Sequence, residues 1–228
     1  MNSNVIFLLL IIAIALSFWA QFKVKGTFNR FAKVPNLYGL TGHDAARRML
    51  DANGLYDIPI EPVRGSLTDH YDPMKRVVRL SEPVFYENSI SSVAVACHEV
   101  GHAIQHKESY SMLVLRHKMF PVVNLTSRVS PFLILAGFIF GALNLAWVGV
   151  FFFSFAVLFQ LVTLPVEFDA THRARKGMLS LGLVSHSEEQ QVGKVLNAAA
   201  LTYVAAALIS LLELLRFVMI LLESRARE

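Results

Sequence analysis

Charge is scarce in this sequence, and cysteine is almost absent. Charged residues make up 17% and hydrophobic residues 54% of the 228 residues, whereas an ordinary soluble domain carries about 25% charged residues. The one cysteine, Cys97, excludes an intramolecular disulfide and a cluster of thiolate zinc ligands. The deficit of charge favours a protein with a lipid-facing surface.

The missing charges leave three long apolar stretches. Residues 1–22, 129–166 and 195–212 contain no Asp, Glu, Lys or Arg, and the third stays apolar to residue 222. Because about 20 apolar residues cross a bilayer, the first stretch predicts one span. The second is long enough for a tight helical hairpin that turns near residues 144–149. The first stretch lacks the basic segment and the cleavage site of a signal peptide, which indicates a retained anchor.

The chain is therefore predicted to alternate between membrane and aqueous segments. The expected order is a first span at 1–22, a polar segment at 23–118, a hairpin of two spans at 119–166, a second polar segment at 167–196, a fourth span at 197–222 and a tail at 223–228.

Basic residues flank the predicted spans, although the net charge is only +4. The positive-inside rule places both polar segments in the cytoplasm and the hairpin tip and both termini outside. This arrangement indicates contact with anionic lipid headgroups rather than with nucleic acid. Arg225 and Arg227 fit it poorly and leave open a last helix that does not fully cross. The flanking residues are Lys23, Lys25, Arg30, Lys33, Arg116, Lys118, Arg128, Arg173, Arg175 and Lys176.

Local signals predict mixed structure in the polar segments. Thr41 and Asp44 form a capping box for a helix that Asn53-Gly54 ends, and Ser187 with Gln190 gives a second such signal. The prolines of residues 58–63 predict an edge strand or an extended loop. Residues 76–80 predict a short strand, also at a sheet edge, that is able to pair with an extended substrate. A helix is expected from about residue 88 to 106, capped by Asn or Ser.

One motif on that helix carries chemistry. His98, Glu99 and His102 match H-E-x-x-H. Residues four apart share one helix face, so two imidazoles can bind one zinc ion there, and Glu99 can reach a water molecule beside it. Zinc lowers the pKa of that water to about 7, and Glu99 then transfers the proton to the leaving amine.

A catalytic zinc ion needs a third protein ligand. His106 is the nearest candidate, but three ligands in a row along one helix cannot easily surround a tetrahedral ion. Glu167 is the better candidate, because a carboxylate among large apolar residues at a membrane boundary needs a partner. Asp169 competes with it, or accepts a hydrogen bond from the outer nitrogen of a ligand imidazole.

These residues carry a resemblance that covers nearly the whole chain. The sequence resembles the bacterial membrane-bound neutral zinc metallopeptidases of the YugP type, and more distantly the HtpX and CAAX prenyl protease clan. The resemblance implies His98, His102 and Glu167 as ligands of one zinc ion per chain, Glu99 as catalytic acid and base, and a site facing the cytoplasm. That clan has Asp where this chain has Thr171, and a hydroxyl orients a histidine more weakly. The matching stretches are 67–73, 79–81, 96–106, 165–170 and 196–204.

Other polar residues are less specific. His70, Tyr71 and His172 are candidate donors to the oxyanion of peptide hydrolysis, but their spacing selects none of them. Glu213 and Arg216 lie three residues apart inside the last apolar helix, either as a functional relay or as a mutual pair.

The sequence therefore predicts an α+β, predominantly helical integral membrane protein with a zincin-like catalytic helix, a small sheet and about four transmembrane helices. The predicted function is a zinc metalloendopeptidase of a bacterial plasma membrane that cleaves membrane-associated or misfolded proteins. A homo-oligomer is left open. One rival is a proteolytically inactive zinc-binding scaffold or adaptor, which has no need of Glu99. The other is a transporter or channel in which the histidines form a metal pathway, which predicts ionisable residues inside the spans, whereas the hairpin has none.

Overall fold

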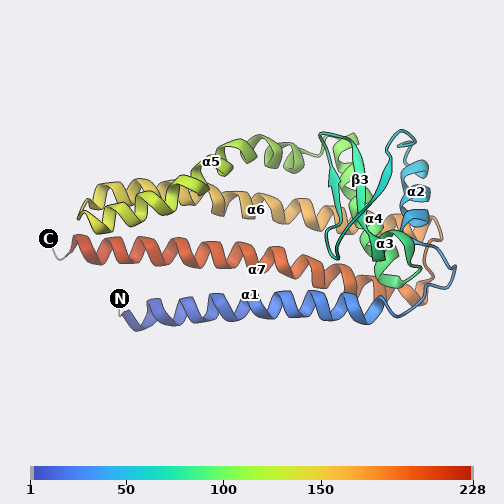
Figure 1. Cartoon of the computed structure of the whole chain (residues 1–228), viewed down its shortest axis with the longest axis horizontal. Helices are drawn as coiled ribbons and strands as arrows, with labels where there is room; N and C mark the ends of the chain where they lie inside the picture. The colour runs from blue at the N-terminus through green and yellow to red at the C-terminus, as the bar shows by residue number, and fades with distance from the viewer. Residues whose placement is uncertain (1–2, 227–228) are drawn as a thin grey trace. The chain divides into compact units, whose positions relative to one another are not determined.

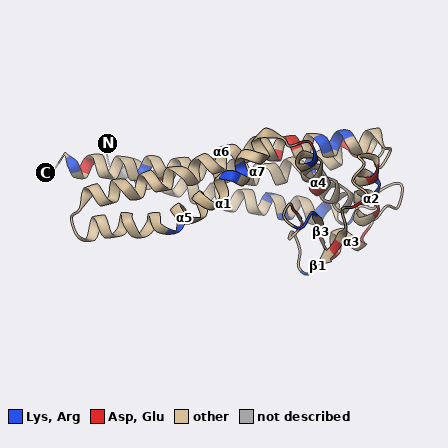
Figure 2. Cartoon of the chain, turned by 90° about the horizontal axis from the view of Figure 1, so that it is seen from above, with Lys and Arg blue, Asp and Glu red and all other residues tan. Residues whose placement is uncertain are grey.

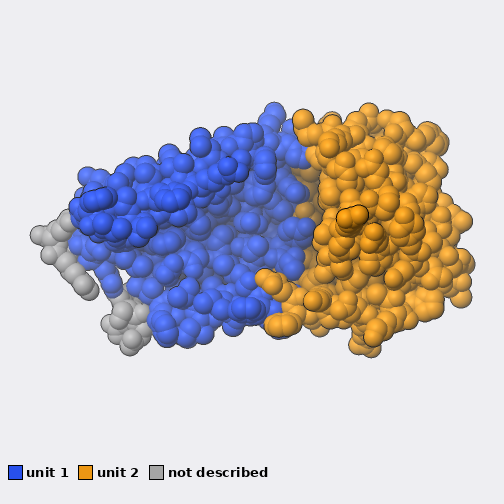
Figure 3. All heavy atoms as spheres, in the orientation of Figure 1, with its two compact units in different colours: residues 1–20, 114–165, 202–228 blue, residues 21–113, 166–201 orange. Residues whose placement is uncertain are grey.

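The computed structural model describes residues 3–226 and has the predicted α+β, mainly helical fold (Figure 1). Its contacts divide the chain into two compact units (Figure 3). The apolar unit comprises residues 1–20, 114–165 and 202–228, and the polar unit comprises residues 21–113 and 166–201. Arg227, which belongs to the predicted tail, lies outside the described residues.

The apolar unit is built from long helices. Within residues 3–226, four helices are long and apolar enough to cross a membrane, as predicted. They are α1 (Ser3–Phe31), α5 (Ser111–Ile139), α6 (Leu143–Ser180) and α7 (His186–Arg225).

The hairpin between α5 and α6 turns earlier than predicted. The two helices end and begin at Ile139 and Leu143, so the predicted turn at residues 144–149 is wrong. Gly141 takes a positive φ of 64°, which glycine adopts without a steric penalty. Gly149 instead packs in the hairpin, where its carbonyl oxygen accepts a hydrogen bond of 2.8 Å from the Ser130 hydroxyl.

The polar unit contains a three-stranded sheet in the order β1-β3-β2. The edge strand β1 (Ile60–Val63) runs parallel to β3 (Val77–Ser81), and β2 (His70–Asp72) runs antiparallel to it. The prediction of a strand near residues 76–80 is confirmed, but its place at the sheet edge is wrong. Most of β3 is buried and both of its edges are paired, so it is not available to a substrate strand.

The sheet and the short helix α3 (Glu82–Tyr86) accompany two capped helices. The predicted capping box of Thr41 and Asp44 opens α2 (Gly42–Ala52), and Ser89 caps α4 (Ile90–Lys107). These helices pack on each other around one buried apolar core, which also includes ends of α1, α6 and α7. Charged residues concentrate on these elements, whereas long stretches of the other helices are free of them (Figure 2).

One predicted cap is displaced by two residues. Ser185 and Glu188, rather than Ser187 and Gln190, exchange the capping hydrogen bonds at the start of α7. Glu188 also accepts a hydrogen bond of 2.7 Å from the backbone N–H of Leu37. This tertiary contact helps to explain why Glu188, rather than Gln190, accepts the hydrogen bond of the capping box.

Candidate metal centre

Helix α4 places two histidines side by side. His98 and His102 lie one turn apart on it, with ring centroids 4.9 Å apart and ring planes at 84°. Ala94, Cys97 and Val100 anchor the helix in the core. Both histidines are only partly buried.

Helix α6 supplies a carboxylate to the same point. Oε2 of Glu167 lies 3.3 Å from Nε2 of His98 and 3.4 Å from Nε2 of His102, and the residue is only 2% exposed. The close approach of the two helices depends on Gly101, where an added Cβ would lie 2.6 Å from the carbonyl oxygen of Ala170. The structure thus brings together the three residues that the sequence predicts as ligands.

The dimensions of this cluster fit a zinc ion. Ligand atoms at the corners of a tetrahedron, each about 2.0–2.1 Å from the ion, lie about 3.3–3.4 Å apart. The two nitrogen–oxygen distances have this length, and the ligand atoms of His98, His102 and Glu167 all lie within 4.8 Å of one another. Two imidazoles and one carboxylate are also the donors of known catalytic zinc sites, which keep a further position for water.

The outer nitrogens of the two rings also have partners. Nδ1 of His98 lies 3.3 Å from the hydroxyl of Thr171, and Nδ1 of His102 lies 3.0 Å from Oε1 of Gln105. Thr171 stands out in the family resemblance, whereas Gln105 is not among the predicted site residues. Its position three residues after His102, on a buried helix, was the available signal, because such residues are neighbours on a helix surface.

Negative charge gathers around the histidines. Burial lowers the pKa of His102, but the hydrogen bond and charge of Glu167, helped by the charge of Glu99, raise it above its ordinary value overall. Glu99 itself is buried and makes no hydrogen bond within the described part of the chain. Burial raises the pKa of Asp69, and the nearby Glu99 carboxylate raises it further, against the opposing hydrogen bonds from Ser81. Asp69 is therefore a like-charged neighbour of Glu99 that the motif does not reveal.

The remaining predicted residues lie around this cluster. Asp169 contacts Gln105 and Arg173 rather than an imidazole. His70 is exposed and its Nδ1 lies 2.8 Å from the carbonyl oxygen of Thr68. The Tyr71 hydroxyl lies 2.9 Å from Nδ1 of His106, and His106 is not part of the metal-ligand cluster found among the described residues.

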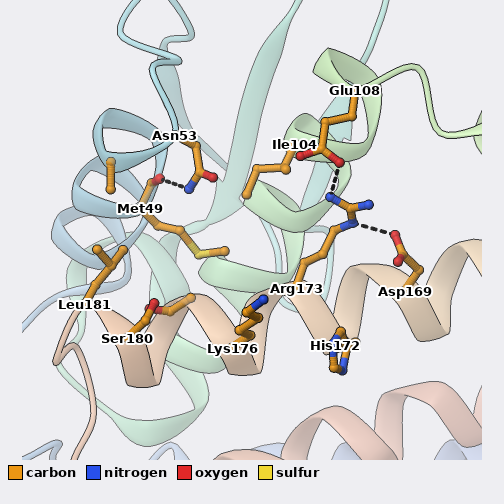
Figure 4. A pocket seen from close by; sticks show the side chains of 12 residues that line it. Met49, Asn53, Ile104, Glu108, Asp169, His172, Arg173, Lys176, Ser180 and Leu181 are labelled. Atoms are coloured by element: carbon orange, nitrogen blue, oxygen red, sulfur yellow. Dashed lines mark hydrogen bonds and ion pairs between the residues drawn. The ribbon is translucent and has the colours of Figure 1, made fainter.

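His172 is also exposed, and it lines a pocket of about 430 Å³ on the polar unit (Figure 4). Within residues 3–226, neither His172 nor His70 makes a hydrogen bond or an ion pair with the three clustered residues. No contact in the described part of the chain singles out an oxyanion donor among His70, Tyr71 and His172.

Fold and site together define a membrane protein with a His-His-Glu cluster suited to a metal ion. A family model described as "Putative neutral zinc metallopeptidase" matches residues 6–222. The chain belongs to this family. It is 63% identical over 217 residues to the "Putative membrane protease YugP" of Bacillus subtilis (strain 168), a match that covers 95% of this chain and 96% of that protein. No solved structure matches the chain.

Proposed function

We propose that this protein is a membrane-embedded zinc metalloendopeptidase in which His98, His102 and Glu167 hold one zinc ion and Glu99 is the catalytic base and acid. The observation that carries the proposal is the cluster itself. Oε2 of Glu167 lies from each of the two Nε2 atoms at the separation expected for two ligands of a tetrahedral zinc ion, and Glu99, which makes no hydrogen bond within the described part of the chain, follows the first histidine. Membership of a zinc metallopeptidase family supports the same assignment.

A zinc ion in this position supplies Lewis acidity, which acidifies a water molecule and polarises the carbonyl group of a peptide bond. The residues of the chain do the rest of the work. Glu99 accepts a proton from the attacking water and returns it to the amine of the leaving peptide. Glu99 lies close enough to His102 to act on its charge, and no hydrogen-bond donor in the described part of the chain occupies the Glu99 carboxylate. Asp69 lies close enough for the charge of Glu99 to raise its pKa, so a second acidic group borders the reaction site.

The substrate class follows from the setting of the site. Four apolar helices make the chain a membrane protein, and the B. subtilis relative bears the name of a membrane protease. We therefore place the substrate among proteins or peptides at the membrane, including misfolded membrane proteins. Basic residues beside the apolar helices favour a cytoplasmic site and contact with anionic headgroups. The inactive scaffold remains the rival, and the retained Glu99 argues against it.

The function is tested by comparing the wild-type protein with Glu99→Gln after purification in detergent. Both proteins should hold about one zinc ion per chain, and cleavage of a casein-like substrate should fall about 100- to 10,000-fold in the variant, since this is the usual share of a general base. Glu61→Gln, which removes an exposed carboxylate of the sheet, is the matched control and should cleave normally. Equal cleavage by Glu99→Gln and wild type would remove the catalytic role of Glu99.

The orientation needs a separate experiment, for which the chain offers a clean background. Its one cysteine, Cys97, is buried, and burial raises the pKa of the thiol, so the native residue is poorly reactive. Met74 lies in the turn between β2 and β3 and is 91% exposed. A Met74→Cys variant should react with an impermeant maleimide only after the cells are opened. Phe140→Cys, in the turn between α5 and α6, should react in intact cells. The reverse labelling pattern would contradict a cytoplasmic site.

A further inference from the structure

The amide of Gln105 is fully buried beside the metal cluster, and both its oxygen and its nitrogen have polar partners. Oε1 faces Nδ1 of His102 at 3.0 Å. Nε2 donates one hydrogen bond of 2.7 Å to the carbonyl oxygen of Val166 and another of 2.8 Å to Oδ2 of Asp169. Leaving any of these groups unpaired in the interior would cost free energy, so the amide is held from both ends.

These partners determine which way the amide points. A carbonyl oxygen and an ionised carboxylate only accept hydrogen bonds, so the group facing Val166 and Asp169 must be the nitrogen of Gln105. The oxygen then faces His102, and the ring has to donate from Nδ1. Nε2 is therefore the nitrogen with the free lone pair, and it is the one that lies 3.4 Å from Glu167. The chain thus selects the tautomer of His102 that a metal requires.

Asp169 is itself held in place. Nε of Arg173, one turn further along α6, donates to the same Oδ2 atom at 2.6 Å, and Nη1 of Arg173 donates to Oε2 of Glu108 at 2.5 Å. The guanidinium also lies over the ring of Tyr110. Figure 4 shows Arg173 between the two carboxylates at the wall of the pocket that α2, α4 and α6 line. A row of hydrogen bonds therefore joins this pocket wall to His102 through the interior.

The two histidines differ in this support. The partner of His98 is the hydroxyl of Thr171 at 3.3 Å, which rotates freely and can donate as well as accept. The partner of His102 lies closer to its ring nitrogen, at 3.0 Å, and is fixed by two further hydrogen bonds. Partners of this kind orient a ligand ring and raise its basicity, and their loss typically lowers metal affinity or activity about 10- to 100-fold.

We propose that Gln105 is a positioning residue that fixes the tautomer and ring orientation of His102 for zinc, and that Asp169, clamped by Arg173, holds Gln105 in its working orientation. This inference rests on the proposed function, because it assumes that His102 binds zinc. It replaces the expectation that Asp169 contacts an imidazole itself.

The test measures zinc affinity in detergent by competition with a chelator. Gln105→Met keeps the size of the side chain but removes the acceptor and both donors, so affinity should fall about 10- to 100-fold. Thr171→Val should cost clearly less, because the hydroxyl is the weaker partner. The visible spectrum of the cobalt-substituted protein is the second readout. It should change in Gln105→Met because the ligand field at His102 changes, which a loss of stability alone would not cause.

The Asp169 variants keep the test independent of a folding defect at Gln105. Asp169→Asn retains an amide oxygen that can accept from both Gln105 and Arg173, so its loss should stay within about threefold. Asp169→Leu retains no acceptor and should lose about tenfold. Asp169 is partly exposed, so these changes disturb the interior less than a change at Gln105.

The outcomes separate this inference from the proposed function. Wild-type zinc affinity and an unchanged cobalt spectrum in Gln105→Met would overturn the inference, even if that variant melts at a lower temperature. Equal losses in Asp169→Asn and Asp169→Leu would overturn the part assigned to Asp169. A wild-type protein that binds zinc but cleaves nothing refutes the proposed function alone, and one that binds no zinc refutes both.

Discussion

The two units of this molecule differ in the size of the side chains that they bury. The polar unit has one continuous core of large apolar residues, including Met49, Leu50 and Met178. In the apolar unit many of the large side chains lie outside: Phe132 is 73% and Phe140 79% exposed. Many residues buried there are small (Ala13, Ala20, Ala146, Ala205 and Ala207).

The contrast shows where the stability of each unit originates. Burial of apolar surface drives a water-exposed domain to fold, which accounts for the polar unit. Between helices in lipid this driving force is missing, and close packing of small residues replaces it. In the polar unit the buried Glu167 faces two partly buried histidines, whereas in the apolar unit Glu213 pairs with Arg216 on the same helix.

The largest expected effect is on zinc affinity, which should depend on a carboxylate of the polar unit and not on one of the apolar unit. Glu167→Ala removes a buried carboxylate that faces two imidazoles, so zinc affinity should fall by more than about 100-fold, beyond the loss typical of a supporting residue. Glu213→Ala removes a carboxylate of the apolar unit and should leave zinc affinity unchanged. Metal analysis and chelator competition measure both. Equal zinc affinity of Glu167→Ala and wild type would contradict the metal centre and with it the contrast.

The next effect is on the stability of the apolar unit. Nη2 and Nε of Arg216 donate to Oε2 of Glu213, at 2.5 and 2.9 Å, so the two charges form the mutual pair that the sequence left open. Arg216→Met leaves the carboxylate without that partner and should destabilise the protein in nanodiscs by about 2–3 kcal/mol. The double variant with Glu213→Gln should recover most of this loss. A double variant as unstable as Arg216→Met would indicate a role beyond neutralisation.

Glycine contacts sharpen the comparison at a smaller scale. An added Cβ at Gly101 meets the Ala170 carbonyl, and one at Gly149 lies 2.6 Å from Cγ1 of Ile134. Gly101→Ala and Gly149→Ala should each cost about 1–3 kcal/mol, but only Gly101→Ala should also weaken zinc binding, because Ala170 lies between Glu167 and Thr171 on α6. Gly26→Ala is the control, because the added Cβ would meet no atom within 4 Å in the described chain beyond the neighbouring residues and backbone of its own helix. Weakened zinc binding in Gly149→Ala would show that the units are not separable in this way.

The sequence predicts the apolar unit and the clustering of His98, His102 and Glu167 better than it predicts the contacts that surround this cluster. Apolar length marks the helices, and H-E-x-x-H marks α4, because both signals are local. The turn at Gly141 and the strand β2 escaped, since one depends on a single φ angle and the other is three residues long. Gln105 escaped for a different reason: its partners Val166 and Asp169 lie 61 and 64 residues away, and only the packing of α4 on α6 brings them together.

The smallest expected effect is on the stability of the polar unit alone, and it depends on the charge of Asp72 and therefore on pH. The backbone N–H of Lys75, together with the Arg79 guanidinium and the N–H of Met74, holds the pKa of Asp72 below its ordinary value. Because the pKa of Asp72 is lower in the folded state, its ionised carboxylate stabilises the turn between β2 and β3. This stabilisation is present at pH values above the unfolded-state pKa of about 3.9, and it is lost as the pH falls through the folded-state pKa.

Asp72→Ala should therefore lower the melting temperature of the polar unit by about 2–4 °C at pH 7, with a difference that shrinks towards zero as the pH falls below 4. Asp57 is the control: it is an exposed ion-pair partner of Arg76. Unlike Asp72, it holds no turn of the backbone, so Asp57→Ala should change the melting temperature little at any pH. Melting curves followed by tryptophan fluorescence would not isolate this unit, because Trp19 and Trp147 both belong to the apolar unit. Hydrogen exchange of the strands β2 and β3, followed as the temperature is raised, reports the unfolding of this part of the polar unit. A difference between wild type and Asp72→Ala that persists undiminished at low pH would mean that the side chain acts through packing rather than through its charge.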